Sequence, residues 1–244
     1  MSHFIKHTSC DNCGSSDAFA IYSDGGGHCF SCHHHTGPTT SPYVTRTASD
    51  GSLDDRLVLP IDCDNIFPEE AVAWLAKYEL NVEDMLRNNV LWSPARSQLI
   101  YCFYGNEGEL VAYQARNFSP KARTKYYTKG SINDILPIYS QRAGLAGLCE
   151  SRPLVVVEDC ASAIKLSNCG LDAMPALGSD LPLYKITQLS HLYSNVLVWL
   201  DGNMFHKAQK IADRFNYLGV KAWANYTELD PKEIPYIELK EIAK

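Results

Sequence analysis

The sequence predicts an α/β chain (α+β overall) with a zinc-binding ribbon at its start and a mostly parallel sheet at its end. Two short apolar runs, 154–157 and 196–200, are typical of buried strands, and each is followed at once by a carboxylate, Glu158 or Asp201. Strand and helix patterns alternate across 151–244, which indicates parallel strands with helices on both faces of the sheet. Two Cys-x-x-Cys pairs near the start predict the ribbon.

Composition excludes several classes of protein. The 244 residues are 45% hydrophobic and 20% charged, which is ordinary for a globular chain and excludes overall disorder. No apolar run approaches the roughly 20 residues of a membrane span, and the polar start lacks the apolar core of a signal peptide. We therefore expect a cytoplasmic protein with no membrane partner. Because the net charge is -6, a nucleic acid would have to meet a local basic patch.

The ribbon is expected over residues 1–36. Its four cysteines, two pairs with fifteen residues between them, suit one tetrahedral Zn²⁺ site, and four thiolates leave no open position for catalysis; they are Cys10, Cys13, Cys29 and Cys32. We therefore expect a structural zinc, with the neighbouring histidines exposed to solvent rather than bound to the metal: His28, His33, His34 and His35. The five cysteines elsewhere show no clustering and are interpreted as small buried residues: Cys63, Cys102, Cys149, Cys160 and Cys169.

A linker and a mixed subdomain follow the ribbon. Residues 37–55 are rich in Gly, Pro, Ser and Thr without an apolar period, which predicts a flexible linker. The subdomain is expected over 56–150, with a helix from Pro68 to about Tyr78 and a short helix that begins at a capping Asn81. The runs 99–104 and 110–116, joined by a Gly-containing loop, predict a β-hairpin.

The second strand of this hairpin opens a basic segment. Between Val111 and Ile132 there are five cations and no acid, with aromatic residues between them; the cations are Arg116, Lys121, Arg123, Lys125 and Lys129. A solvated loop is the plain interpretation. The absence of acids in an acidic chain favours a contact with phosphates or with a single strand of nucleic acid.

The last domain, 151–244, alternates between the two kinds of element. Strands are expected at 154–157, 174–177, 195–200 and 220–223, and helices at 160–168, 183–190 and 205–217. Ligands of open α/β sheets bind beyond the carboxyl ends of the strands. If the first and third strands are neighbours, Glu158 and Asp201 together form a site for a divalent metal ion.

These motifs resemble those of phage-type DNA primases, the primase half of phage primase-helicases. The paired knuckles, the run Asp-Asn-Cys-Gly-Ser-Ser at 11–16 and Tyr-Ser-Asp-Gly at 22–25 resemble their zinc ribbon. Glu158 with the helix after it, the turn at Gly178, and Asp201-Gly202-Asn203 resemble the toprim catalytic core that they share with bacterial replicative primases. The resemblance implies a toprim domain over 151–244 and a primase-core subdomain over 56–150.

The resemblance also implies an activity. A primase makes short RNA primers from ribonucleoside triphosphates on a single-stranded DNA template, by metal-dependent nucleotidyl transfer. Glu158, Asp201 and Asn203 would then bind Mg²⁺ or Mn²⁺, Arg116 and Lys125 would neutralise phosphates, and Asp24 and His28 would contact the template. No GxxxxGK motif occurs, so we expect a separate helicase and DNA polymerase as partners, in the cytoplasm of a bacterial host if a phage encodes the chain.

The chain departs from the family at the metal site. Asn203 stands where the family has a second Asp, which removes one negative charge, and His206 stands where it has a small Gly. Asp159 or Asp180 would restore the charge; the alternative is that both are ordinary turn acids. Two other functions remain open: a catalytically impaired, primase-derived protein that binds single-stranded DNA at priming sites, and a toprim nuclease or topoisomerase-like enzyme.

Overall fold

The computed structural model describes residues 3–23, 25–32, 34–36, 57–133, 135–141, 153–178 and 180–242. The chain divides into two compact units, Met1–Asp55 and Arg56–Lys244. The predicted linker, together with Asp24 and Cys149, lies outside the described residues, so its role stays a prediction. Within the described part, none of the helices has the length and apolar character needed to cross a membrane.

The first unit is a small antiparallel sheet. Its strands are β1 Phe4–Thr8, β2 Phe19–Tyr22, β3 Gly27–Cys29 and β4 His35–Thr36, paired in that order. The loop after β1 turns at Gly14, whose φ of 70° is in the region that favours glycine and whose N–H donates to the Cys10 carbonyl at 2.8 Å. Cys29 ends β3, so the sheet brings the two cysteine pairs together.

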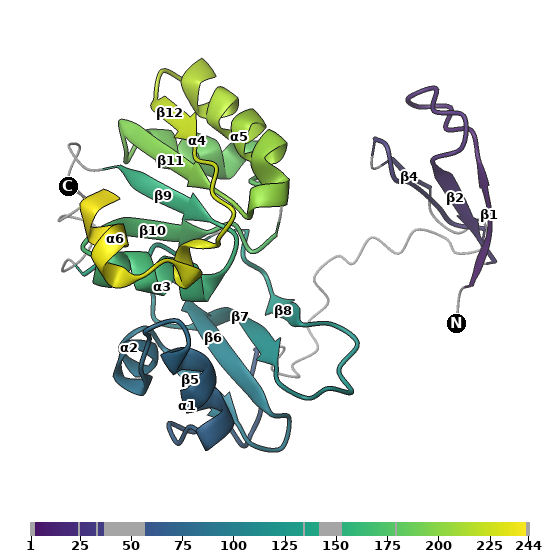
Figure 1. The fold of residues 1–244 in the computed structure, drawn as a ribbon. Coiled ribbons are helices and arrows are strands. Elements are labelled where there is room, and N and C mark those ends of the chain that lie inside the picture. The colour runs from purple at the N-terminus through teal and green to yellow at the C-terminus, as the bar shows by residue number, and fades with distance from the viewer. Residues whose placement is uncertain are drawn as a thin grey trace. The chain divides into compact units, whose positions relative to one another are not determined.

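The second unit begins with two helices and an antiparallel sheet (Figure 1). The helices are α1 Glu69–Ala76 and α2 Val82–Arg87, and Asn81 caps α2 through a capping box with Asp84. The sheet pairs β5 Val90–Ser93, β6 Gln98–Tyr104, β7 Leu110–Asn117 and β8 Tyr126–Gly130 in chain order. The predicted hairpin is confirmed as β6 and β7. The sequence did not predict β5 or β8, and β8 takes in the end of the basic segment.

The parallel sheet of this unit has the order β10-β9-β11-β12. Its strands are β9 Leu154–Val157, β10 Asp172–Pro175, β11 Asn195–Trp199 and β12 Lys221–Ala224, and all three pairings are parallel, as predicted. The helices are α3 Cys160–Asn168, α4 Leu183–Ser190, α5 Phe205–Tyr217 and α6 Tyr236–Ile242. The expected strand 174–177 was placed two residues too late, because Leu177 has a left-handed φ of 57° and cannot continue a strand.

Helices cover both faces of the parallel sheet (Figure 1). Leu154 and Val156 of β9 pack in one cluster with apolar residues of α4 and α5, whereas Val155 and Val157 pack in another with α3 and the antiparallel sheet. The strand that follows β9 in the chain, β10, pairs on one side of β9, and the next strand, β11, pairs on its other side. The crevice between the carboxyl ends of β9 and β11 is therefore the switch point of the sheet, where ligands of such folds bind.

Candidate active site and zinc centre

The four ribbon cysteines form the first candidate metal centre. Their Sγ atoms all lie within 4.8 Å of one another, with Cys10 to Cys32 and Cys13 to Cys29 each at 3.7 Å. Zn–S bonds of about 2.3 Å in a tetrahedron imply sulfur separations of about 3.8 Å, whereas a disulfide would need about 2.05 Å. Hydrogen bonds from Asn12 and from the His34 backbone lower the pKa of Cys32 to about 6, whereas burial raises the pKa of Cys10 to about 11, so the sulfur geometry carries the assignment. The cluster fits a structural zinc.

The second candidate site is a cavity of about 240 Å³ at the carboxyl ends of β9 and β11, which we call the acidic cavity. Four carboxylates and two ammonium groups line it, together with Gln114, Tyr126 and the turn at Leu177 and Gly178; the charged residues are Glu158, Asp159, Asp201, Asp230, Lys125 and Lys232. The strand register explains why Glu158 and Asp201 lie close together, because Val157 of β9 lies opposite Trp199 of β11. Glu158 and Asp201 therefore leave the sheet at the same edge, as predicted.

Three of these carboxylates interact in sequence, Glu158 with Asp201 and Asp201 with Asp230. Burial, the hydrogen bond with Asp230 and the charge of Glu158 raise the pKa of Asp201 to about 7. Burial and the charges of Asp159 and Asp230 likewise raise the pKa of Glu158. Burial alone would also raise the pKa of Asp230, but hydrogen bonds from Lys232 and Asp201 outweigh it and lower that pKa.

This donor set fits a divalent cation. The negative charges of these neighbouring acids repel one another, and a hard cation would relieve that repulsion. The acids form an open chain rather than a cage, because within the described part of the protein only the cysteines bring three or more ligand atoms within 4.8 Å of one another. An open chain suits Mg²⁺, which commonly binds one or two carboxylates and keeps several waters.

Asp230 is the acid that sequence reasoning missed. It follows β12, the neighbour of β11, so the loop after β12 reaches the same edge of the sheet. Five residues separate it from the end of β12, and it looks like an ordinary turn residue because it caps the 3₁₀ turn Pro231–Glu233 through a capping box. The useful signal was its position after a predicted strand of the sheet.

The other acids that were expected to compensate for Asn203 do not supply a free carboxylate. Asp159 lines the cavity, but its Oδ1 accepts from the Ser162 N–H at 2.9 Å as the cap of α3, and its Oδ2 accepts from Lys232 Nζ at 2.7 Å. Asp180 is 67% exposed, pairs with Arg214 at 2.9 Å and is not among the lining residues. Asn203 is exposed in the 3₁₀ turn Gly202–Met204 and does not line the cavity either.

The basic residues separate into three groups. Lys125 lines the acidic cavity. Arg116 does not line it, because its guanidinium lies 4.1 Å from the Trp74 ring and 5.1 Å from the Phe118 ring, and its Nη1 donates to the Tyr126 hydroxyl at 3.2 Å. Arg116 Nε is buried without a hydrogen-bond partner among the described residues. The remaining three are exposed, two in the loop between β7 and β8 and one in β8: Lys121, Arg123 and Lys129.

On the ribbon, His28 belongs to a row of rings. Neighbouring ring centroids lie 4.4–5.9 Å apart along the order Phe4, His7, Phe30, His28 and His35. Phe4 is 50% exposed and Phe30 is 58% exposed, although both are large apolar side chains. His34 and His35 are exposed, as expected for the histidine run.

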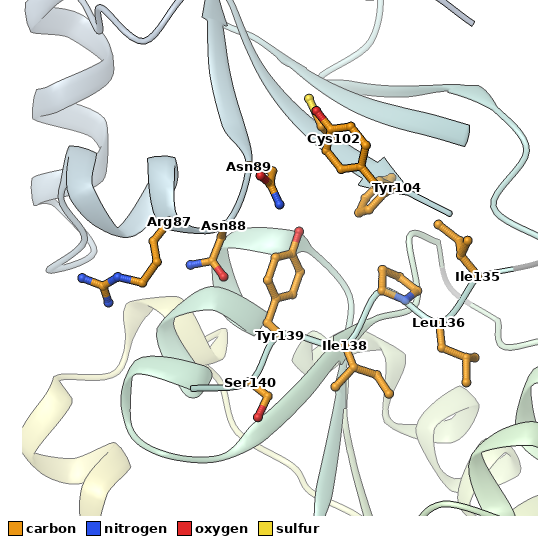
Figure 2. Close-up of a pocket in the computed structure, with 12 residues that line it drawn as sticks. Arg87, Asn88, Asn89, Cys102, Tyr104, Ile135, Leu136, Ile138, Tyr139 and Ser140 are labelled. Atoms are coloured by element: carbon orange, nitrogen blue, oxygen red, sulfur yellow. The ribbon is translucent and has the colours of Figure 1, made fainter. Parts of the chain in front are cut away.

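A different cavity, of about 280 Å³, lies beside β6 (Figure 2). Figure 2 shows Asn88 and Asn89 on one side of it and the segment from Ile135 to Ser140 on the other. It shares no lining residue with the acidic cavity and contains no carboxylate. Because metal-dependent chemistry on phosphates needs such oxygen ligands, the acidic cavity is the candidate active site.

Comparison with known proteins gives the fold. No family model matches the chain. A DNA helicase/primase of Enterobacteria phage T3 is 54% identical over 33 residues, a match that spans 14% of this chain and only 6% of that protein. The primase fragment of the bacteriophage T7 primase-helicase is similar over 99% of this chain and 98% of its own, with 16% identity and a TM-score of 0.50.

Bacterial primases are similar over about two thirds or more of the chain. The RNA polymerase domain of Mycobacterium tuberculosis primase DnaG has a TM-score of 0.59 at 12% identity, covering 72% of this chain and 76% of its own. The E. coli primase catalytic core has a TM-score of 0.53 at 16% identity, covering 66% of each chain. The chain therefore has the fold of phage and bacterial DNA primases, with a four-cysteine cluster before its α/β core.

Proposed function

We propose that this protein is a DNA primase, which joins ribonucleotides into short RNA primers on a single-stranded DNA template. The observation that carries the proposal is the convergence of Glu158, Asp201 and Asp230 with Lys125 in one cavity, at the switch point of a sheet with the primase fold. The short identity with the phage helicase/primase supports the same assignment.

The charges of the cavity suit nucleotidyl transfer. In that reaction a 3′ hydroxyl attacks an α-phosphorus, and a bound Mg²⁺ or Mn²⁺ supplies charge stabilisation for the attacking and leaving oxygens. Glu158 and Asp201 would hold the ion, and Asp230 would add negative charge beside Asp201. Lys125 is exposed where it lines the cavity, so its ammonium is free to bind phosphate oxygens of the incoming nucleotide.

For Arg116 we propose a positioning role instead of the phosphate contact that the resemblance to primases implies. Its guanidinium is enclosed by aromatic rings and bonded to Tyr126, which itself lines the cavity. We assign it to positioning Tyr126 and the start of β8. Since Lys125 directly precedes Tyr126, this packing also sets where the Lys125 backbone lies.

The template contacts would lie on both units. Exposed rings bind single-stranded nucleic acid by stacking on its bases, and exposed cations bind its phosphates. The ring row of the ribbon, with His28 inside it, supplies the first kind of contact; Lys121, Arg123 and Lys129 supply the second. A helicase and a DNA polymerase would act with it, in the cytoplasm of a bacterial host if a phage encodes the chain.

A primer-synthesis assay tests the proposal. The purified chain is incubated with single-stranded DNA, labelled ribonucleotides and Mg²⁺ or Mn²⁺. We expect short RNA products that Glu158→Gln abolishes and that Glu83→Gln, an acid of α2 outside the cavity, leaves unchanged. Binding of DNA without products would instead support the primase-derived binding protein, and cleaved template would support a toprim nuclease.

A further inference from the structure

Lys232 is the buried cation of the acidic cavity. Its side chain is only 5% exposed, and its Nζ donates to Asp159 Oδ2 at 2.7 Å and to Asp230 Oδ2 at 2.5 Å. It bridges an acid of the loop after β9 and an acid of the loop after β12. Neither the strand pattern nor the resemblance to primases predicted a lysine in this place.

Buried contacts from outside the cavity hold this lysine in position. The Lys232 carbonyl accepts from Lys165 Nζ at 3.0 Å, and Lys165, on α3, is 1% exposed. Lys165 in turn pairs with Glu79 at 3.1 Å, and Glu79 Oε2 also accepts from the Tyr236 N–H at 2.7 Å. Because the Lys232 carbonyl bonds to the buried Lys165 and its ammonium bonds to acids that are only 14% and 21% exposed, its charge has little freedom to leave the acids.

The charge of Lys232 divides the acidic cavity into two ends. At one end, Asp159 and Asp230 share the ammonium between them. Two ion pairs, at 2.7 Å to Asp159 and 2.5 Å to Asp230, hold the positive charge of the ammonium at this end. At the other end, no ion pair neutralises Glu158 or Asp201 within the described part of the protein.

We propose that the Lys232 ammonium takes the place of one metal ion, so that the cavity binds a single divalent cation at its Glu158 and Asp201 end. This inference rests on the proposed function, because it assumes that the cavity is the metal site of the primase. Two-metal sites place two ions about 3.5–4 Å apart to serve the attacking and leaving oxygens. Here a side-chain cation would supply the second positive charge, anchored by Asp159 and Asp230.

Counting bound Mn²⁺ tests the inference without relying on activity. The full zinc-loaded chain is titrated with Mn²⁺, and the free ion is followed by electron paramagnetic resonance. We expect one bound ion for the wild type and for Lys232→Arg, which keeps the charge. Lys232→Gln should bind a second ion, or bind the first at least about tenfold more tightly, because the repulsion of a neighbouring positive charge is gone.

The possible outcomes separate the inference from the proposed function. Two ions in the wild type, or an unchanged count and affinity in Lys232→Gln, would overturn the role of Lys232 and leave the primase proposal standing. No bound ion, or binding that Glu158→Gln does not weaken, would overturn both. Thermal unfolding checks that the variants fold. If Lys232→Gln does not fold, the neutral and nearly isosteric Lys232→Met replaces it, with the same tenfold gain expected and unchanged count and affinity as the contrary result.

Discussion

The contact between Glu79 and Lys165 gives a stability prediction whose size follows from the structure. Lys165 is buried on α3, and Glu79, in the loop between α1 and α2, is its only carboxylate partner among the described residues. Glu79→Gln leaves the ammonium without a counter-charge. Breaking a fully buried pair costs about 3–5 kcal/mol, but the Glu79 side chain is 49% exposed and water screens it, so we expect a loss of about 1–2 kcal/mol at pH 7.

The same contact predicts how that loss depends on pH. The Tyr236 N–H and Lys165 lower the pKa of Glu79 below its ordinary value. A lowered pKa stabilises the folded state above the unfolded pKa of about 4.3, and this stabilisation disappears as the pH falls through the folded value. The difference between wild type and Glu79→Gln should therefore be present at pH 7 and shrink below about pH 4.

Urea unfolding of both proteins at several pH values measures this difference. Glu83→Gln is the matched control, because Glu83 is 83% exposed and its pair with Arg87 on α2 should be worth no more than about 0.5 kcal/mol. Equal urea midpoints for Glu79→Gln and wild type at pH 7 would refute the reasoning, as would a difference that does not change with pH.

Three further predictions concern the metal centre, the basic segment and the ring row. Removing zinc with a chelator should release one equivalent per chain, measured with a metal-sensitive dye, and should expose residues 1–36 to protease while the second unit stays resistant; no change in cleavage would contradict this. Arg116→Ala should lower the free energy of unfolding by about 1–3 kcal/mol through lost packing on Trp74 and Phe118, whereas the exposed Lys121→Ala should leave it within about 0.5 kcal/mol in the same urea assay. Phe30→Ala should weaken binding of single-stranded DNA about fivefold or more by fluorescence anisotropy, and Phe30→Trp should retain it; equal affinities for wild type and Phe30→Ala would argue against stacking.

The sequence predicted the parallel sheet well because its signals are local. The apolar run of β9 ends at Glu158, and Asp159 provides a helix cap directly before α3, so the bounds of both elements agree with the structure. Neighbouring strands then bring Glu158 and Asp201 to one edge. The four cysteines were equally readable, because their spacing alone specifies the cluster.

The parts that the sequence missed depend on contacts between distant residues. The sequence did not reveal that Trp74 of α1, far earlier in the chain, lies against the Arg116 guanidinium. The strand β8 forms because it pairs with β7, although its composition resembled a basic loop. Asp230 and Lys232 reach the cavity only because β12 is the neighbour of β11, an order that periodicity does not reveal.

The most direct test of the central claim compares two acids of the second unit in the primer-synthesis assay. Asp230 lines the cavity beside Asp201, whereas Asp180 is exposed and paired with Arg214. We predict that Asp230→Asn reduces the yield of labelled RNA at least about tenfold, by analogy with the loss of a single charge-stabilising group, and that Asp180→Asn leaves it unchanged. The opposite pattern, or full synthesis by Asp230→Asn, would contradict the assignment of this cavity as the primase active site.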